Sequence, residues 1–350
     1  MTRSTLINVS FSASLLVGLA ACSDGCCSPD RRVADPLMET QVLTVAELQA
    51  WAWPPGEDAW RALDDAQIVE LEQLISLLVS EAESAHLSRA QRRAAAALAG
   101  LVGVELHRVV VATDARRGVE LWVVTEPADD RRGRGVYLIR VGKIGSRRSE
   151  PELLIEAPHC RFDRHTGAIA LKLFVEGDAG PPRALFMNSA HRYRHTDGSR
   201  EMREPASANL ADAAHNPDHP IARVTARLLE QRELAVIQLH GFGRSAAAGD
   251  PDVIVSAGVA RPRRASAATL LRLRRALPEH PMAHFGVDTD RLGARTNVQG
   301  RSARATSRCF VHIELSEALR KRLLGDREVR RRFASAVFKL DPEELRGGCR

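Results

Sequence analysis

The chain has 350 residues, a formal net charge of +6 and only 4% aromatic residues. This length allows one main α/β catalytic domain with a sizeable core. Arginine is spread through the chain beside many acidic residues, and neither a concentrated basic stripe nor a known nucleic-acid motif is present, so we expect no nucleic-acid partner. The mild positive charge suits a protein that works beside anionic lipid or an anionic cell-wall polymer.

The N-terminus has the pattern of an export segment. A charged start at Arg3 is followed by a short apolar stretch, 7–18, and by the small-residue sequence Leu19-Ala20-Ala21-Cys22. The apolar stretch is too short and too polar to span a bilayer. The pattern resembles a bacterial lipoprotein signal over residues 1–21. This resemblance implies that Cys22 carries a lipid anchor, which would hold the protein to a membrane of the cell envelope, in the periplasm or on the outer surface.

The six cysteines would then lie in an oxidising setting, but their spacing defines no connectivity. Cys160 follows a candidate metal ligand, and Cys309 precedes a candidate strand. A bridge between them and a pair of buried free thiols both remain open. The cysteines are Cys22, Cys26, Cys27, Cys160, Cys309 and Cys349.

Between the signal and the main domain, the composition predicts a flexible tether over 22–43 and a helical segment over 44–100. Thr44 can cap a helix with Glu47 three residues on, and apolar residues recur at helical spacing through 66–85. A further helix is expected over 88–98. Three segments of strand-like composition follow at 105–112, 118–125 and 135–141, and their turn-rich separators predict an antiparallel meander.

From residue 151 the pattern alternates between strands and helices. Such alternation predicts an α/β fold with a mixed, mainly parallel sheet flanked by helices, within a domain that spans 101–345. We expect strands near 152–157, 184–189, 234–239, 252–256 and 309–315, and helices over 169–175, 220–231, 267–276 and 316–324.

Two histidines end apolar strands of this α/β part. His159 closes the first strand, with Asp163 one turn later, and His240 closes the third. Ligands of open α/β sheets bind beyond the carboxyl ends of the strands, so the two imidazoles and a carboxylate are expected to converge on one cation. Zn²⁺ suits that set best. Asp163 is the preferred carboxylate; an ion pair of Asp163 with Arg161 or Arg164 stays an alternative.

Other features support this interpretation. Glu156, earlier in the first strand, is an alternative that would orient a ligand from behind. His240 is followed by Gly241 and Gly243, which leaves room for a substrate near the backbone.

Glu314 lies inside the apolar strand Val311-His312-Ile313-Glu314-Leu315. A buried carboxylate costs several kcal/mol unless it is paired or has a function. The functional interpretation is a general base that takes a proton from attacking water and hands it to the leaving amine. The alternative is a salt bridge to Arg192 or Arg301.

The order of these elements resembles the N-formylglutamate amidohydrolases and, more distantly, the zinc carboxypeptidases and poly-γ-glutamate hydrolases. The likeness covers about 150–325 and implies a phosphorylase/hydrolase-like fold. It implies that His159 and His240 are metal ligands, that Glu314 is the base and that Arg192 holds the substrate carboxylate. The family's Asp-x-Asn element is similar to Asp212 and Asn216 here, although Pro217 follows where the family has Arg, and the spacing after His159 differs from the carboxypeptidase His-x-x-Glu.

Three further residues are candidates for substrate binding. His215 lies in a loop and is either a ligand in place of Asp163, a group that polarises the scissile carbonyl, or a solvated side chain. Arg301 can clamp a carboxylate through its planar fork, and Asn297 lies just before it. Arg301 is otherwise one of many solvated arginines.

The sequence thus predicts a lipid-anchored, zinc-dependent amide hydrolase. Its substrate would be a carboxylate-bearing small peptide or N-acyl amino acid, such as one derived from the cell wall. The alternative is a non-catalytic envelope lipoprotein that binds a cell-wall component or a partner protein. Serine hydrolases and phosphate-loop enzymes are disfavoured because their motifs are absent from the sequence. Cys160 is disfavoured as a nucleophile activated by His159, because adjacent residues of a strand point to opposite faces.

Overall fold

The computed structural model describes residues 39–341 except 55–58, 114–117, 145–151, 178–179 and 244–249. The predicted lipoprotein signal, with Cys22, and most of the predicted tether lie outside the described residues. The strands are β1 (Thr40–Leu43), β2 (Glu105–Val111), β3 (Val119–Thr125), β4 (Val136–Arg140), β5 (Glu152–Ala157), β6 (Ala184–Met187), β7 (Leu234–Gly241), β8 (Val253–Ser256), β9 (Met282–His284) and β10 (Phe310–Leu315). The helices are α1 (Val45–Ala52), α2 (Asp65–Glu81), α3 (Arg89–Val102), α4 (Thr166–Glu176), α5 (Pro220–Gln231), α6 (Arg264–Ala276), α7 (Val298–Ala305), α8 (Glu317–Gly325) and α9 (Arg327–Phe338).

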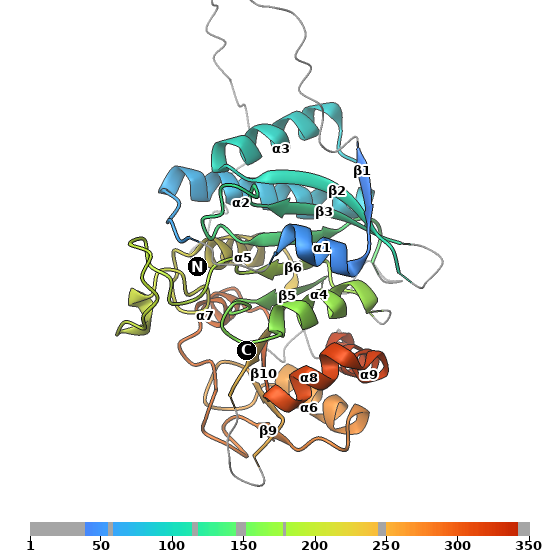
Figure 1. Cartoon of the computed structure of the whole chain (residues 1–350). Helices are drawn as coiled ribbons and strands as arrows, with labels where there is room; N and C mark the ends of the chain where they lie inside the picture. The colour runs from blue at the N-terminus through green and yellow to red at the C-terminus, as the bar shows by residue number, and fades with distance from the viewer. Residues whose placement is uncertain are drawn as a thin grey trace, which may run out of the picture. The chain divides into compact units, whose positions relative to one another are not determined.

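All these strands belong to one mixed sheet, in the order β1-β2-β3-β4-β6-β5-β7-β10-β8-β9 (Figure 1). Strands β6, β5, β7 and β10 are parallel to their neighbours within this central group. The predicted meander is present as β2-β3-β4, and its last strand pairs antiparallel with β6. The predicted mixed α/β fold is therefore confirmed, and the meander extends the central sheet instead of forming a separate layer.

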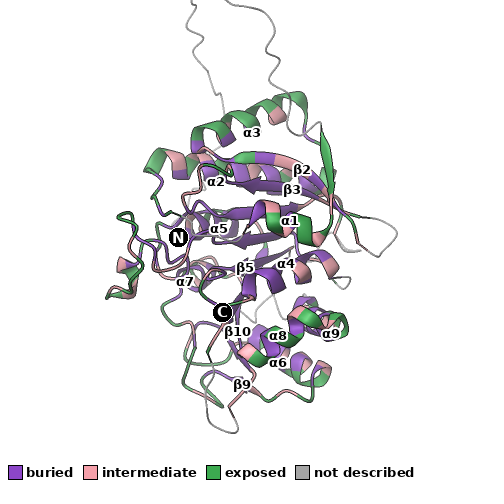
Figure 2. Cartoon of the chain, viewed as in Figure 1, coloured by how far each residue is buried: buried purple, intermediate pink, exposed green. Residues whose placement is uncertain are grey.

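Helices cover both faces of the sheet. One apolar core lies between the sheet and helices α1, α4, α6, α8 and α9, and a second lies between the sheet and α2, α3, α5 and α7. Figure 2 shows the central strands as a buried layer between partly exposed helices, while β1 at the edge of the sheet is exposed. The N-terminal helices share the second core with α5, and Glu72 of α2 accepts a hydrogen bond of 3.0 Å from Arg223 of α5.

Three helices begin with capping boxes that can be recognised in the sequence. The predicted capping box of Thr44 and Glu47 is present at the start of α1. Asp64 with Gln67 and Ser88 with Gln91 form the same motif at the starts of α2 and α3. Each box satisfies amide groups that a helix end otherwise leaves unpaired. Among the described residues, none of the helices has the length and apolar character needed to cross a bilayer.

Candidate metal centre

His159, Asp163 and His240 meet at the carboxyl edge of the central strands. His159 lies in the turn after β5, and His240 is the last residue but one of the neighbouring parallel strand β7. The Asp163 Oδ2 atom is 3.7 Å from His159 Nδ1 and 3.4 Å from His240 Nδ1. All three side chains are buried, and one candidate ligand atom from each lies within 4.8 Å of the others. The structure thus brings the three predicted ligands together.

Acceptors behind the two imidazoles fix which nitrogen faces the cluster. His159 Nε2–H donates to Asp212 Oδ1 at 2.8 Å, and His240 Nε2–H donates to Gln238 Oε1 at 2.8 Å. Each ring therefore presents the lone pair of its Nδ1 atom towards Asp163. Two imidazole nitrogens and one carboxylate oxygen, with each ring held by a hydrogen bond from behind, form a donor set whose chemistry fits Zn²⁺.

Asp163 is also tied to the backbone of β7. The Gly241 amide donates to Asp163 Oδ2 at 3.0 Å, which holds the turn after β5 against the end of β7. Arg161, one of the two predicted alternative partners, lies over the Trp53 ring at 4.6 Å and donates to the Pro54 carbonyl. The Asp163 carboxylate therefore faces histidines from two elements.

Asp212 connects this cluster to Arg192 and His215. Its carboxylate is fully buried and accepts hydrogen bonds from His159, Arg192 and the Ala214 amide. His215 Nδ1 lies 3.1 Å from Asp212 Oδ1, so His159, Asp212 and His215 form a second group of potential ligands. The predicted substrate-binding residues Asp212 and His215 are thus neighbours of His159, and Asp212 contacts it directly.

Arg192 is a partly buried side chain beside His159. Its Nη1 atom is 3.2 Å from His159 Nδ1, and its guanidinium carbon lies over the rings of Phe162 and Tyr193, at 5.4 and 5.0 Å. These ring contacts restrict the guanidinium, whose Nη2 atom already donates to Asp212 Oδ2. Phe162 is 47% exposed, so this aromatic surface faces solvent beside the cluster.

Glu314 of β10 is in register with His240 of β7. Cross-strand partners point to the same face of a sheet, so the Glu314 carboxylate lies on the side of the metal cluster. Its Oε1 atom is 3.5 Å from Nε2 of His312, and the His312 ring lies 4.7 Å from the His240 ring. Sequence reasoning missed His312, although its spacing of two residues from Glu314 already placed both side chains on one face.

The electrostatics of the cluster follow from burial and charge. Burial lowers the pKa of His240 to about 4, so this ring is neutral and ready to bind a metal at neutral pH. Burial opposes the charged form of His159 too, but the charge of Asp212 raises its pKa above the ordinary value. Burial raises the pKa of Asp163, yet its interactions with His159 and His240 outweigh this effect and lower the pKa. Burial, with the charge of Asp163, raises the pKa of Glu314 to about 8.

Two residues predicted to bind substrate have other contacts. Asn297 is buried; its Nδ2 donates to Gln238 Oε1 and its Oδ1 caps α7 at the Gly300 amide. Because both ends of the amide are engaged, Asn297 supports the cluster from behind and does not face a substrate. Arg301 is exposed on α7 and donates to the Thr296 carbonyl, so its described contacts do not include the cluster.

The expectation of open space over Gly241 is wrong. A Cβ atom on Gly241 would lie 2.1 Å from Arg320 Nη1. Arg320 is 4% exposed, reaches back from α8 and donates to the carbonyls of Phe242 and Leu315. The glycine therefore makes room for a buried guanidinium, not for a substrate.

The cysteine prediction is also resolved in part. Cys160 is a free, buried thiol, whereas Cys309 is disulfide-bonded, so neither the bridge between them nor the pair of free thiols is formed. Burial raises the pKa of Cys160 to about 12, and its Sγ atom faces the Ala157 carbonyl at 2.7 Å. A thiol with this pKa is a poor nucleophile at neutral pH.

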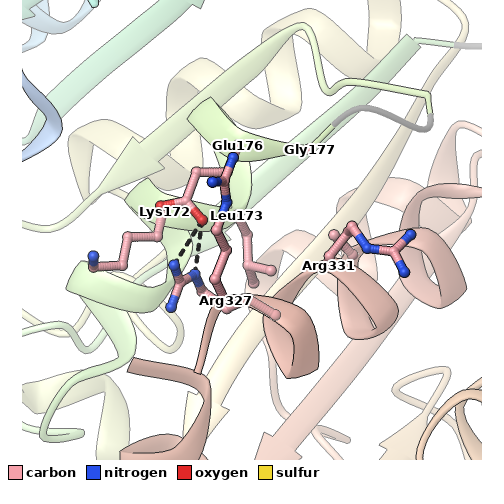
Figure 3. Close-up of a pocket in the computed structure, with 8 residues that line it drawn as sticks. Lys172, Leu173, Glu176, Gly177, Arg327 and Arg331 are labelled. Atoms are coloured by element: carbon pink, nitrogen blue, oxygen red, sulfur yellow. Dashed lines mark hydrogen bonds and ion pairs between the residues drawn. The ribbon is translucent and has the colours of Figure 1, made fainter. Parts of the chain in front are cut away.

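A small cavity, shown in Figure 3, lies at the opposite end of α4 from Asp163. It measures about 30 Å³ and lies between Lys172 and Glu176 of α4 and Arg327 and Arg331 of α9. Arg330 closes it by donating two hydrogen bonds, of 2.9 and 2.7 Å, to Glu176 Oε2. Its size suits a water molecule and not a substrate.

No protein-family model and no curated protein matches the chain. Similar solved structures include an N-formylglutamate amidohydrolase from Ralstonia eutropha, with 12% identity, a TM-score of 0.33 and coverage of 57% of this chain and 95% of that one. A metallo-carboxypeptidase from Burkholderia cenocepacia has 12% identity, a TM-score of 0.35 and coverage of 72% and 68%. An aspartoacylase family protein from Mesorhizobium loti has 17% identity, a TM-score of 0.35 and coverage of 68% and 69%. At such identities and TM-scores these likenesses extend no activity to the chain.

Proposed function

We propose that this protein is a zinc-dependent amide hydrolase. The observation that carries the proposal is the convergence of His159 Nδ1, His240 Nδ1 and Asp163 Oδ2, with both imidazoles anchored through Nε2 and a buried Glu314 in register with His240. Ligands and a base on one rim are what metal-assisted hydrolysis needs. A protein that only binds a cell-wall component or a partner needs no such complete set.

The residues divide the chemistry among them. Zinc, when bound by His159, Asp163 and His240, would supply a Lewis acid that polarises the scissile carbonyl and lowers the pKa of an attacking water. Glu314 accepts the proton of that water and returns it to the leaving amine. Zinc held by His159, Asp163 and His240 would oppose the effect of burial on the pKa of Glu314 and so favour the carboxylate form that a base requires.

The surroundings of Arg192 support the proposed substrate class. A guanidinium restricted by Phe162 and Tyr193 and placed beside His159 suits a carboxylate near the scissile bond. We therefore assign a carboxylate-bearing small peptide or N-acyl amino acid as the substrate. The lipid anchor on Cys22 and the cell-envelope location belong to the same proposal and rest on residues 1–22 of the sequence.

Metal analysis and one matched pair of variants test the proposal. Purified protein should hold zinc in stoichiometric amount and hydrolyse N-acyl amino acids until a chelator removes the metal. Glu314→Gln should retain the zinc and lower kcat by roughly 10²- to 10⁴-fold, because it removes only the proton acceptor. Glu317→Gln, at the partly exposed start of α8, should leave kcat unchanged. Protein without stoichiometric metal would refute the proposal in favour of the binding alternative.

A further inference from the structure

A row of polar side chains crosses the centre of the sheet where an apolar core is expected. Glu156 of β5 pairs with Gln238 of β7, Gln238 with His312 of β10, and His312 with Ser256 of β8. All four side chains are buried on one face of the sheet. Earlier residues of the same strands on this face are apolar, as in Leu154, Val236 and Phe310. Because buried polar groups are costly unless they are satisfied, the row needs a reason.

Gln238 is the centre of this row. Its Nε2 atom donates to Glu156 Oε2 at 2.8 Å, and its Oε1 atom accepts from both His240 Nε2 and Asn297 Nδ2. A carboxylate accepts only, so the amide nitrogen of Gln238 has to face Glu156. The carbonyl oxygen then has to face His240, and it accepts a proton only from the Nε2–H tautomer of that ring.

The chain of hydrogen bonds from His240 through Gln238 to Glu156, called the relay below, is held by residues of two helices. Glu156 Oε1 accepts from the Thr225 hydroxyl of α5, and Asn297 is the N-cap of α7. Neither Glu156 nor Gln238 offers an atom to the metal cluster itself. Both are therefore free of the ligand role. Donation runs in one direction, from His240 Nε2 to Gln238 and from Gln238 Nε2 to Glu156.

We propose that Glu156 and Gln238 are positioning residues that hold His240 in the tautomer and orientation needed for its Nδ1 atom to bind the metal. The inference rests on the proposed function, since it requires the metal site. The negative carboxylate of Glu156 polarises the Gln238 amide, and the amide carbonyl in turn draws on the Nε2–H of His240, which makes Nδ1 a better ligand. Loss of such a partner typically weakens metal binding by about 10- to 100-fold.

Metal affinity, and not activity, is the readout. The metal-free full-length protein is titrated with Zn²⁺ against a chromogenic chelator, and with Co²⁺ to record its absorption spectrum. The pH is kept above the value of about 7 to which burial raises the pKa of Glu156, so that this carboxylate is charged. Gln238→Leu should weaken Zn²⁺ binding by about 10- to 100-fold and alter the Co²⁺ spectrum. Gln299→Leu is the matched control, because Gln299 is an equally buried amide that bonds Ala213 instead, and it should leave the affinity unchanged.

A swap of the two residues provides the sharper variant. In Glu156→Gln with Gln238→Glu, a carboxylate at 238 can accept from His240 and Asn297, and an amide at 156 can donate to it while accepting from Thr225. The swap should therefore keep Zn²⁺ affinity close to that of the unaltered protein, whereas Glu156→Gln alone weakens it several-fold. If Gln238→Leu fails to fold, these two variants still decide the matter.

The outcomes separate the two proposals. Unaltered protein that takes up no Zn²⁺ would refute both. Protein that takes up Zn²⁺ with the same affinity after Gln238→Leu, or with a swap variant as weak as Gln238→Leu, would overturn the relay and leave the hydrolase proposal standing. Weak binding by Gln238→Leu with recovery in the swap would support the relay.

Discussion

Replacement of Gly241 by alanine should destabilise the protein through a single contact. The new methyl group would lie 2.1 Å from Nη1, 2.5 Å from Cζ and 2.9 Å from Nε of Arg320. No real Cβ atom tolerates such distances, so the guanidinium has to move. Arg320 is buried and bonds the carbonyls of Phe242 and Leu315, so a displaced side chain gives up hydrogen bonds in a place where water does not replace them.

The magnitude can be worked from these contacts. Overpacking of a tight site costs about 1–3 kcal/mol, and a hydrogen bond to a charged donor contributes about 1.5–3 kcal/mol. We expect Gly241→Ala to lower the free energy of unfolding by about 3 kcal/mol, the result of strain and partial loss of these bonds. Gly243→Ala is the matched control, because a Cβ there meets nothing within 4 Å, and it should change the stability by less than about 0.5 kcal/mol.

Urea denaturation followed by tryptophan fluorescence measures the effect. A double-mutant cycle identifies its cause: once Arg320→Ala has removed the guanidinium, adding Gly241→Ala should cost less than about 1 kcal/mol, since the clash is gone. Equal stabilities of the two glycine variants, or the same loss with and without Arg320, would refute the reasoning.

Three further predictions concern buried groups and the mouth of the site. Burial raises the pKa of Glu156 from 4.5 to about 7, so between these values the folded state holds a proton that the unfolded state has released. The free energy of unfolding should therefore fall by about 3 kcal/mol as the pH rises through this range. Urea titrations at several pH values should show this slope, and Glu156→Gln should remove it. Cys160 should resist alkylation in native protein and react after denaturation, as mass spectrometry of its peptide would show; rapid native labelling would contradict its burial. Arg192→Ala should raise KM roughly 30-fold, about 2 kcal/mol, for a carboxylate substrate but not for its carboxamide analogue; equal effects on both would rule out carboxylate recognition.

The fold could be predicted in outline because hydrophobic periodicity and helix caps are local signals. The capping box at Thr44 and the apolar strand that ends at His240 are examples. The elements that escaped prediction depend on their neighbours. Strand β1, within the predicted tether, is exposed and exists through its pairing with β2, and the three residues of β9 need β8 beside them. Helix α7 is short and contains Gly300, which weakens its helical pattern. Helix α9 does carry Val329, Phe333 and Val337 at helical spacing, a signal that the sequence reasoning did not use.

In the candidate site, too, local signals could be predicted and contacts between strands could not. Strand ends are visible in sequence, which is why His159 and His240 could be placed on one rim. Side-chain partners across strands are not visible, because they depend on register. Gln238 and Arg320 therefore escaped notice, and Asn297 was given a role at the substrate when its amide lies behind the ligands.

The shared core beneath α2, α3 and α5 bears on how the protein can be divided. A shortened chain beginning at Leu101 would carry every proposed ligand, yet it would expose to water the apolar wall formed by β2, β3, β4 and α5. Uncovered surfaces of that kind associate with one another. A smaller soluble version of this protein should therefore begin ahead of α2, because α2 and α3 cover the apolar face of the strands next to the proposed ligands.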